Sequence, residues 1–183
     1  MITRGEDIVL PGVGVVSLRP AAPGDDEFLL AVYASTRADE LAQVPWSDEQ
    51  KAAFVRMQFD AQRRDYDARY PGAQYDVILL DARPVGRLWV GRDREEIRLL
   101  DIALLPEEQN RGVGGALISR LIEEARAGVK VLRHMVFIMN PDAQRFYERL
   151  GFRVFEEVGA YRHMEWRPEG EGGATEEGAS GKS

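Results

Sequence analysis

The stretch that decides the fold of this 183-residue chain lies between residues 104 and 117. It reads Leu104-Leu105-Pro106-Glu107-Glu108-Gln109-Asn110-Arg111-Gly112-Val113-Gly114-Gly115-Ala116-Leu117. The pattern predicts a strand that passes through a short glycine-rich turn into an amphipathic helix. The first N–H groups of a helix have no partner inside the helix and carry partial positive charge, so this turn is suited to an anion.

The residues of the turn favour an anion the size of a diphosphate. Gly112 and Gly114 lack the Cβ atoms that would hold a phosphate away from the backbone, and Arg111 adds a cation. A dinucleotide fingerprint needs a third glycine where Leu117 stands, and a phosphate loop needs Gly-Lys-Ser/Thr before the helix. One structural alternative remains open, in which the glycines only make the turn tight and let the helix pack close to the sheet.

The sequence on both sides of the turn alternates predicted strands and helices. Before it we expect a strand at 13–18, a helix from Asp25 or Asp26 to Arg37, a helix from a Ser47–Gln50 capping box to just before Pro71, and strands at 74–80, 85–90 and 97–105. After it we expect a helix that ends at Gly128, a strand at 131–139, a short helix closed by Gly151, and strands at 152–158 and 161–166. This order predicts an α/β (α+β) fold, a single layer of sheet with helices packed on it.

The length fits one domain with a substantial core. We expect the folded domain at residues 13–167, preceded by an N-terminal extension at 1–12. Residues 168–183 are mostly Gly, Glu, Ser, Ala and Thr and include no large apolar residue, so we expect a disordered tail.

Composition excludes several kinds of site and partner. The chain has no cysteine, which removes disulfides and thiolate chemistry and fits a reducing cytoplasm. Its two histidines, His134 and His163, have no partners at metal-ligand spacing, so we expect no metal site. The net charge of −7 and the lack of a basic run argue against nucleic acid, and no apolar run is long enough to span a membrane. The acidic balance slightly favours a cationic partner, although it also simply keeps the protein soluble.

Two segments together resemble the GNAT superfamily of acyl-CoA-dependent N-acyltransferases. Gln109-x-x-Gly112-x-Gly114 matches the Gln/Arg-x-x-Gly-x-Gly/Ala signature of that superfamily. Its second conserved segment is similar to Asn140-x-x-Ala143-x-x-Phe146-Tyr147-x-x-Leu150-Gly151-Phe152. The resemblance implies a mixed, mostly antiparallel sheet of about seven strands with four main helices. It also implies that the fourth and fifth strands splay apart around the cofactor.

The resemblance implies acetyl-CoA as cosubstrate and assigns residues to it. The expected contacts are the loop and helix start at Gln109, Asn110, Arg111, Gly112, Val113, Gly114 and Gly115, the strand end at Ala103 and Leu104, and Asn140. Asn140 precedes Pro141 and is equally well explained as a helix cap. Tyr147 corresponds to the general acid that protonates the departing thiolate, or else it is a core tyrosine.

The proton acceptor is harder to assign, because Arg98 stands where histone-type members of the superfamily place a glutamate. Asp101 and Glu96 are the candidates, on opposite faces of one strand, and Asp101 is favoured because it is closer to the strand end. Trp46, Trp89 and Tyr75 are candidates for an acceptor pocket or for the core. Asp39 and Glu40 are candidates for recognising a cation or for a solvated loop.

The function that the resemblance implies is transfer of an acetyl group to a primary amine, by direct attack in a ternary complex. A non-catalytic acyl-CoA-binding or sensor domain is the alternative. A covalent acyl-enzyme is not expected, because the chain has neither cysteine nor a Gly-x-Ser-x-Gly element. The identity of the amine stays open, as does assembly into a homodimer.

Overall fold

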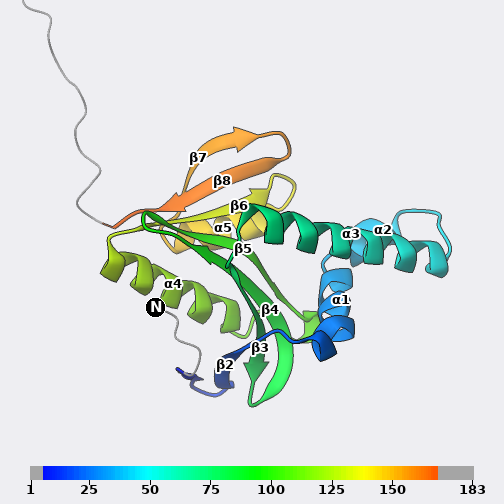
Figure 1. Ribbon diagram of the computed structural model, residues 1–183, viewed down its shortest axis with the longest axis horizontal. Coiled ribbons are helices and arrows are strands. Elements are labelled where there is room, and N and C mark those ends of the chain that lie inside the picture. Colours follow the sequence, from blue (N-terminus) through cyan, green and yellow to red (C-terminus); the bar gives the residue numbers. More distant parts are fainter. Residues whose placement is uncertain (1–5, 169–183) are drawn as a thin grey trace, which may run out of the picture.

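The computed structural model describes residues 6–168. They form one twisted sheet with helices on both faces (Figure 1). The strands are β1 Ile8–Leu10, β2 Gly14–Pro20, β3 Gln74–Leu80, β4 Arg83–Arg92, β5 Glu96–Leu104, β6 Val131–Phe137, β7 Arg153–Val158 and β8 Tyr161–Trp166. The α-helices are α1 Asp26–Ser35, α2 Ala38–Ala42, α3 Asp48–Arg69, α4 Val113–Gly128 and α5 Pro141–Arg149, and short 3-10 turns lie at Pro23–Asp25 and Pro106–Glu108.

The sheet has the order β1-β2-β3-β4-β5-β6-β8-β7. Every neighbouring pair is antiparallel except β5 and β6, which are parallel. The mixed, mostly antiparallel sheet is therefore confirmed, with eight strands in place of about seven. The additional strand is β1, which pairs with β2 from within the segment expected to be an N-terminal extension. Most of the expected tail lies outside the described residues.

The splay between the fourth and fifth predicted strands is present between β5 and β6. Pairing covers only Glu96–Arg98 on β5 and Val131–Arg133 on β6. Beyond these residues β5 continues to Leu104 and β6 to Phe137 without being paired to each other. The two strands therefore diverge toward their carboxyl ends and leave a gap that opens beside the start of α4.

Local sequence signals explain most helix boundaries. The predicted capping box is formed, since the Gln50 amide donates to Ser47 Oγ and the Ser47 amide donates to Gln50 Oε1. The helix predicted to end at about Arg37 is α1, which ends at Ser35 and is followed by the separate short helix α2. The hydroxyls of Ser35 and Thr36 donate to the carbonyls of Val32 and Tyr33, and such bonds compete with helix continuation.

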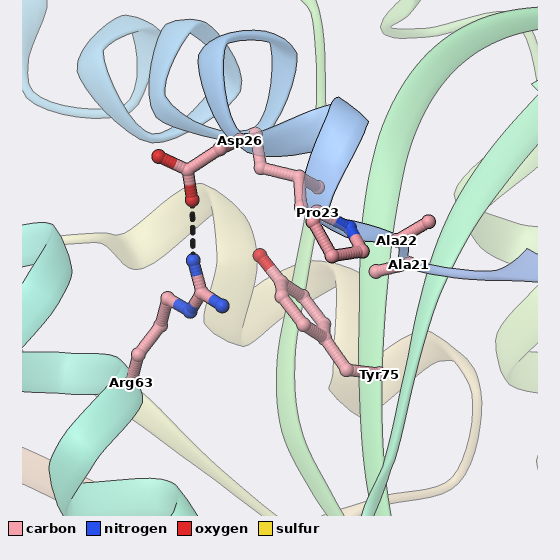
Figure 2. Close-up of a pocket in the computed structure, with 7 residues that line it drawn as sticks. Ala21, Ala22, Pro23, Asp26, Arg63 and Tyr75 are labelled. Atoms are coloured by element: carbon pink, nitrogen blue, oxygen red, sulfur yellow. Dashed lines mark hydrogen bonds and ion pairs between the residues drawn. The ribbon is translucent and has the colours of Figure 1, made fainter.

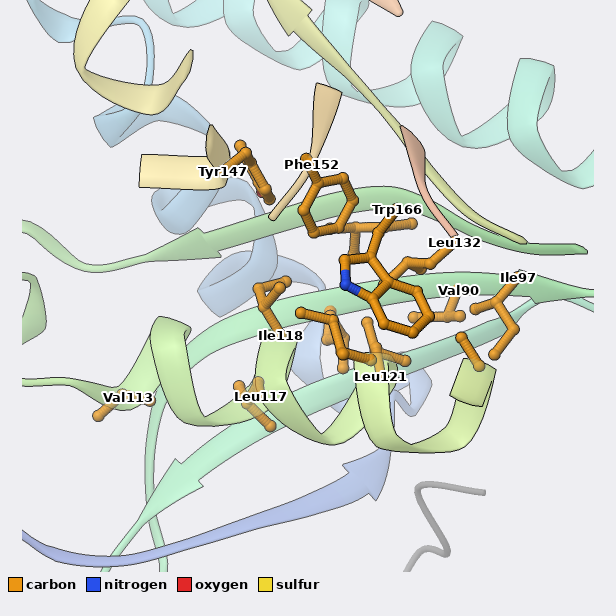
Figure 3. Packing of buried hydrophobic residues seen from close by; sticks show 14 of the residues in the cluster. Val90, Ile97, Val113, Leu117, Ile118, Leu121, Leu132, Tyr147, Phe152 and Trp166 are labelled. Carbon is orange, nitrogen blue, oxygen red and sulfur yellow. The ribbon is translucent and has the colours of Figure 1, made fainter. Parts of the chain in front are cut away.

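The two faces of the sheet bury separate cores. On one face, the apolar stripe of α4 packs with α5 and Trp166 against residues such as Val90, Ile97 and Leu132 (Figure 3). On the other face, α1 and α3 enclose Leu29, Tyr33, Phe59 and Val77. The gap between β5 and β6 therefore has α4 and α5 on one side and α1 and α3 on the other. None of the helices between residues 6 and 168 combines the length and the apolar character that crossing a membrane requires.

Candidate active site

The start of α4 presents backbone N–H groups that the protein does not use. Gly112 is the N-cap residue with a φ of 86°, and Asn110 before it has a φ of 59°. No side chain caps this helix end. Within the described residues, no hydrogen bond is formed by the amides of Asn110 to Gly115, and the bonded backbone resumes where the Ala116 amide donates to the Gly112 carbonyl. This end of the helix is thus free to bind an anion.

The glycines of this turn leave open space and do not serve close packing. A Cβ at Gly112 would meet no atom within 4 Å. At Gly114 and Gly115 the nearest atoms, from Leu104 and Phe146, would lie 3.9 Å away, which is ordinary van der Waals contact. The structural alternative for these positions, close helix–sheet packing, is therefore not required here. The positive φ of Gly112 is the one feature that the turn itself demands of a glycine.

Side chains anchor the loop to the end of β5. The amide of Gln109 donates through Nε2 to the Leu104 carbonyl over 3.0 Å. Glu108 is 5% exposed and forms ion pairs with both Arg83 and Arg111. The guanidinium of Arg111, expected as a cation for the ligand, is thus already paired with a buried carboxylate. The sequence analysis missed Glu108 and Arg83, although the three-residue spacing of Glu108 and Arg111 is a signal for such a pair.

Ala103 and Leu104 lie at the end of β5, on the border of the gap. Both are paired with β4, Ala103 with Arg87 and Leu104 with Gly86. The other edge of β5 has no strand partner beyond Arg98. An extended ligand in the gap could form backbone hydrogen bonds along that free edge, as a further strand would.

A bulge in β5 shapes the closed end of the gap. Trp89 pairs with Asp101 and Val90 with Leu99, so Leu100 is the extra residue on β5. Two side chains fix the carbonyls of the bulge: the Tyr66 hydroxyl donates to Leu100 over 3.1 Å, and His134 Nδ1 lies 2.9 Å from the Leu99 oxygen. Because a carbonyl can only accept, Nδ1 of His134 carries the proton and Nε2 keeps its lone pair.

Tyr147 is almost fully buried on α5, on the α4 side of the gap. Its ring packs against His134, Phe146 and Phe152, with centroids 4.6, 5.1 and 5.3 Å away. Burial raises the pKa of Tyr147 far above its ordinary value, so the hydroxyl stays protonated at neutral pH, as a proton donor must. Burial also lowers the pKa of His134, which makes this imidazole neutral. His134 was not assigned to the site from the sequence.

Asp101 is held by a buried arginine from the next strand. Nε of Arg87 lies 2.7 Å from Asp101 Oδ2, an ion pair whose angles fall short of a hydrogen bond. Arg87 is 1% exposed, its Nη2 donates to Gln62 over 3.2 Å, and its guanidinium lies 5.1 Å from the Tyr33 ring centroid. The structure therefore assigns Asp101 a partner that the sequence analysis did not identify, because Arg87 lies fourteen positions away and is adjacent only through sheet pairing.

The other candidates are placed as follows. Glu96 is paired with Arg98 and Arg133. Asn140 caps α5, since the Ala143 amide donates to its Oδ1 over 3.0 Å. On the α3 face, Tyr75 and Trp89 stack on each other with centroids 4.1 Å apart, whereas Trp46 is 41% exposed in the loop before α3 and packs on Phe54.

Asp39 and Glu40 lie exposed on α2, and Glu40 is paired with Arg37. In residues 6–168 no three His, Asp or Glu side chains are grouped so that they could hold a metal ion.

Comparison with known families identifies the family to which this chain belongs. Residues 34–152, more than half of the chain, match the family model described as acetyltransferase (GNAT) family. The chain belongs to the GNAT family. The matched range includes the free amides at the start of α4, the gap between β5 and β6, and Tyr147.

Solved GNAT structures share the fold. PaiA N-acetyltransferase from Thermoplasma acidophilum, solved in complex with coenzyme A, matches with a TM-score of 0.64 at 19% identity, covering 83% of this chain and 98% of that one. An acetyltransferase from Thermus thermophilus matches with a TM-score of 0.60 at 25% identity, covering 84% and 96%. The fold of these two acetyltransferases thus extends over most of this chain.

The curated relatives align with this chain over a shorter stretch than the solved structures do. An uncharacterized N-acetyltransferase of Methanocaldococcus jannaschii is 32% identical over 96 residues, which cover 48% of this chain and 42% of the relative. CgeE, an uncharacterized N-acetyltransferase of Bacillus subtilis, is 25% identical over 105 residues, covering 52% and 40%. The aligned parts span less than half the length of these relatives.

Proposed function

We propose that this GNAT protein transfers the acetyl group of acetyl-CoA to a primary amine of a small molecule or protein. The observation that carries the proposal is the row of unused amides at the start of α4, next to a gap between β5 and β6. In this proposal the CoA pyrophosphate binds the amides from Asn110 to Gly115, and the pantetheine arm lies along the free edge of β5 near Ala103 and Leu104. The coenzyme A in the solved PaiA complex supports this choice of ligand.

The proposed chemistry is direct attack in a ternary complex. The amine nitrogen attacks the thioester carbon, and backbone N–H groups of β5 stabilise the resulting oxyanion. When the intermediate collapses, the carbon–sulfur bond breaks and the Tyr147 hydroxyl donates to the departing thiolate. A covalent acyl-cysteine is excluded because the chain has no cysteine.

The amine must lose a proton for this reaction. A lysine-like amine has a pKa of about 10.4, so only roughly one molecule in 10³ is neutral at pH 7. In the proposal Asp101 accepts the proton, directly or through water, because its side chain is 21% exposed and faces the α1–α3 side of the gap. Arg87 holds this carboxylate in place through the ion pair of its Nε with Asp101 Oδ2.

Two measurements test the proposal. Calorimetric titration with CoA measures binding to the α4 loop, and a panel of primary amines incubated with acetyl-CoA measures transfer through thiol release and the mass of the product. We expect a saturable CoA site and at least one amine whose mass rises by one acetyl group. A folded protein that does not bind CoA contradicts the proposal at its base.

The second candidate is a non-catalytic acyl-CoA-binding or sensor domain. The observation that favours it is the pairing of both candidate carboxylates, Asp101 with Arg87 and Glu96 with two arginines. It predicts CoA binding without thiol release for every amine in the panel. The two readouts together therefore separate the candidates.

A further inference from the structure

A cavity on the face of the sheet that carries α1 and α3 is not part of the proposed CoA site. Its volume is about 440 Å³, within the range of small-molecule sites, and it is lined by Ala21, Ala22, Pro23, Asp26, Leu29, Arg63 and Tyr75 (Figure 2). It lies against β3, whereas Asp101 is on β5. Because neighbouring strands are about 4.8 Å apart, the cavity is roughly 10 Å across the sheet from Asp101.

The hydroxyl of Tyr75 is one polar group of the cavity that lacks a hydrogen-bond partner within residues 6–168. Tyr75 extends from β3, and its hydroxyl end points toward Arg63 and Pro23 (Figure 2). Its oxygen is buried and forms no hydrogen bond within residues 6–168. The Arg87 guanidinium lies near this oxygen, yet without the angles of a hydrogen bond. Buried hydroxyls normally have a partner, so this one is suited to a ligand atom.

Arg63 and Asp26 are the charged residues that line the cavity. Nη1 of Arg63 is paired with Asp26, whose other oxygen is taken by Arg56. Arg56, followed by Arg63, lowers the pKa of Asp26, so this carboxylate is ionised, and both of its oxygens are already occupied. Among the described residues, the other N–H groups of Arg63 have no hydrogen-bond acceptor. The groups left to a ligand are therefore a cationic donor and a phenol.

We propose that this cavity binds a small carboxylate that carries an apolar body. The carboxylate accepts hydrogen bonds from Arg63 and from the Tyr75 hydroxyl, an arrangement in which a charged donor makes the stronger bond. The apolar body lies against Leu29, Pro23 and the two alanines. An amine would compete with Arg56 and Arg63 for the oxygens of Asp26. The proposal concerns binding alone and does not depend on acetyl transfer.

Benzoate, benzamide and inorganic phosphate are the probes, each titrated calorimetrically into the full chain. Benzoate combines both features, benzamide keeps the body without the charge, and phosphate keeps the charge without the body. We expect saturable benzoate binding that is about ten-fold tighter than that of either comparator, the equivalent of one charged hydrogen bond or of burying the ring. No saturable benzoate binding up to roughly 10 mM, or equal binding of a comparator, would overturn the proposal.

Variants locate the binding to this cavity. Arg63→Gln and Tyr75→Phe should each weaken benzoate binding by about ten-fold, while the matched variant Arg69→Gln, six residues further along α3 and paired with Asp65, should not change it. Unchanged benzoate affinity in Arg63→Gln contradicts the site. Tyr75→Phe should keep the thermal stability of the parent, because the hydroxyl it removes has no hydrogen bond to lose.

CoA titration of the same variants provides a separate check. We expect unchanged CoA affinity in all of them, because the cavity and the start of α4 lie on opposite faces of the sheet. A chain that fails to bind CoA but binds benzoate contradicts the proposed transferase and leaves the carboxylate site intact. A chain that binds CoA but does not bind benzoate contradicts the carboxylate site and leaves the proposed transferase intact.

Discussion

In the proposed mechanism, the surroundings of Tyr147 and Asp101 decide what each residue can do. Tyr147 and Asp101 carry ordinary acid–base groups, but a hydrophobic shell surrounds the first and a buried guanidinium holds the second. Two of these partners cannot be inferred from the local sequence, because His134 lies thirteen positions from Tyr147 and Arg87 fourteen positions from Asp101. The sequence did predict Tyr147 as a candidate, since its helix segment resembles that of the GNAT family.

The substitution Tyr147→Phe tests whether the Tyr147 hydroxyl is the proposed proton donor. We expect turnover of acetyl-CoA to fall about ten-fold or more, because the leaving thiolate loses a hydrogen bond that strengthens as charge develops. CoA affinity should be unchanged, since the phosphates bind elsewhere. Steady-state thiol release together with CoA titration checks both. An equal turnover number in the variant and the parent would mean that Tyr147 only packs in the core and does not donate a proton.

The ion pair between Asp25 and Arg19 should make the free energy of unfolding depend on pH, in a direction that can be predicted. Arg19 donates to both oxygens of Asp25 over 2.7 and 2.6 Å and, as the largest cause, holds the pKa of this carboxyl at about 2, against an ordinary 3.8. A carboxyl whose pKa is lower in the folded protein stabilises the fold at pH values above its pKa in the unfolded chain. This stabilisation is lost as the pH falls from 3.8 toward 2. Asp25→Asn should therefore unfold more easily at pH 7, by about 1 kcal/mol, since Arg19 is partly exposed to solvent.

Urea unfolding at a series of pH values measures this difference. We expect the gap between Asp25→Asn and the parent protein to close as the pH approaches 2. A gap that is the same at pH 7 and near pH 2 would mean that the charge of Asp25 contributes nothing and that the substitution acts through packing or backbone.

At the scale of the element, the decisive unit is the strand, turn and helix from β5 to α4. Its glycines and its apolar stripe predicted both the helix and an anion site, and the helix is formed at Val113–Gly128 with its first amides unused. The sequence could not show that Arg111 is paired with Glu108, because a local pattern cannot say which side chains a fold buries. Nor could it show the separate helix α2, where two hydroxyl side chains compete for the carbonyls of α1.

Gly114 tests whether this turn holds a pyrophosphate. Gly114→Glu should weaken CoA binding at least ten-fold. In the parent protein the unused backbone groups of this turn are N–H donors, and the variant would place a carboxylate beside the bound phosphates. Gly114→Ala is the matched control. Its Cβ would meet nothing closer than 3.9 Å, and the family signature accepts alanine there, so CoA affinity should be close to that of the parent.

Calorimetric titration measures both affinities, and thermal unfolding shows that both variants are folded. Because Gly114 is a helical position, alanine should also stabilise the free protein, by roughly 0.5–1 kcal/mol. Similar CoA affinity in Gly114→Glu and the parent would place the pyrophosphate away from this turn.

At the scale of the whole molecule, the sheet divides the protein into two working faces. The face with α4 and α5 supports the amides and Tyr147, and the face with α1 and α3 carries Asp101 and the cavity of Figure 2. The gap between β5 and β6 is the place where the two faces meet. In the proposed ternary complex, the cosubstrate and the acceptor would therefore enter from different sides of the sheet.

CoA should stabilise the whole domain. A ligand that bridges β5, α4 and α5 binds only the folded state, so at a hundred times its dissociation constant it adds about 2.7 kcal/mol to the free energy of unfolding. The midpoint of thermal unfolding should rise accordingly with CoA and should not rise in Gly114→Glu at the same CoA concentration. An equal rise in both proteins would show that CoA acts somewhere other than the start of α4.

The sequence by itself determined most of the elements and the glycine-rich turn before α4, because propensity, capping and apolar periodicity act over a few neighbouring residues. It predicted the bounds of β3 and β8 as they are found, and the two conserved segments of the GNAT family in their order. Only the tertiary structure decided the pairing of Arg87 with Asp101, the contact of His134 with Tyr147 and the cavity at Tyr75. These depend on contacts between residues distant in the chain, whose energies arise only once the sheet brings them together.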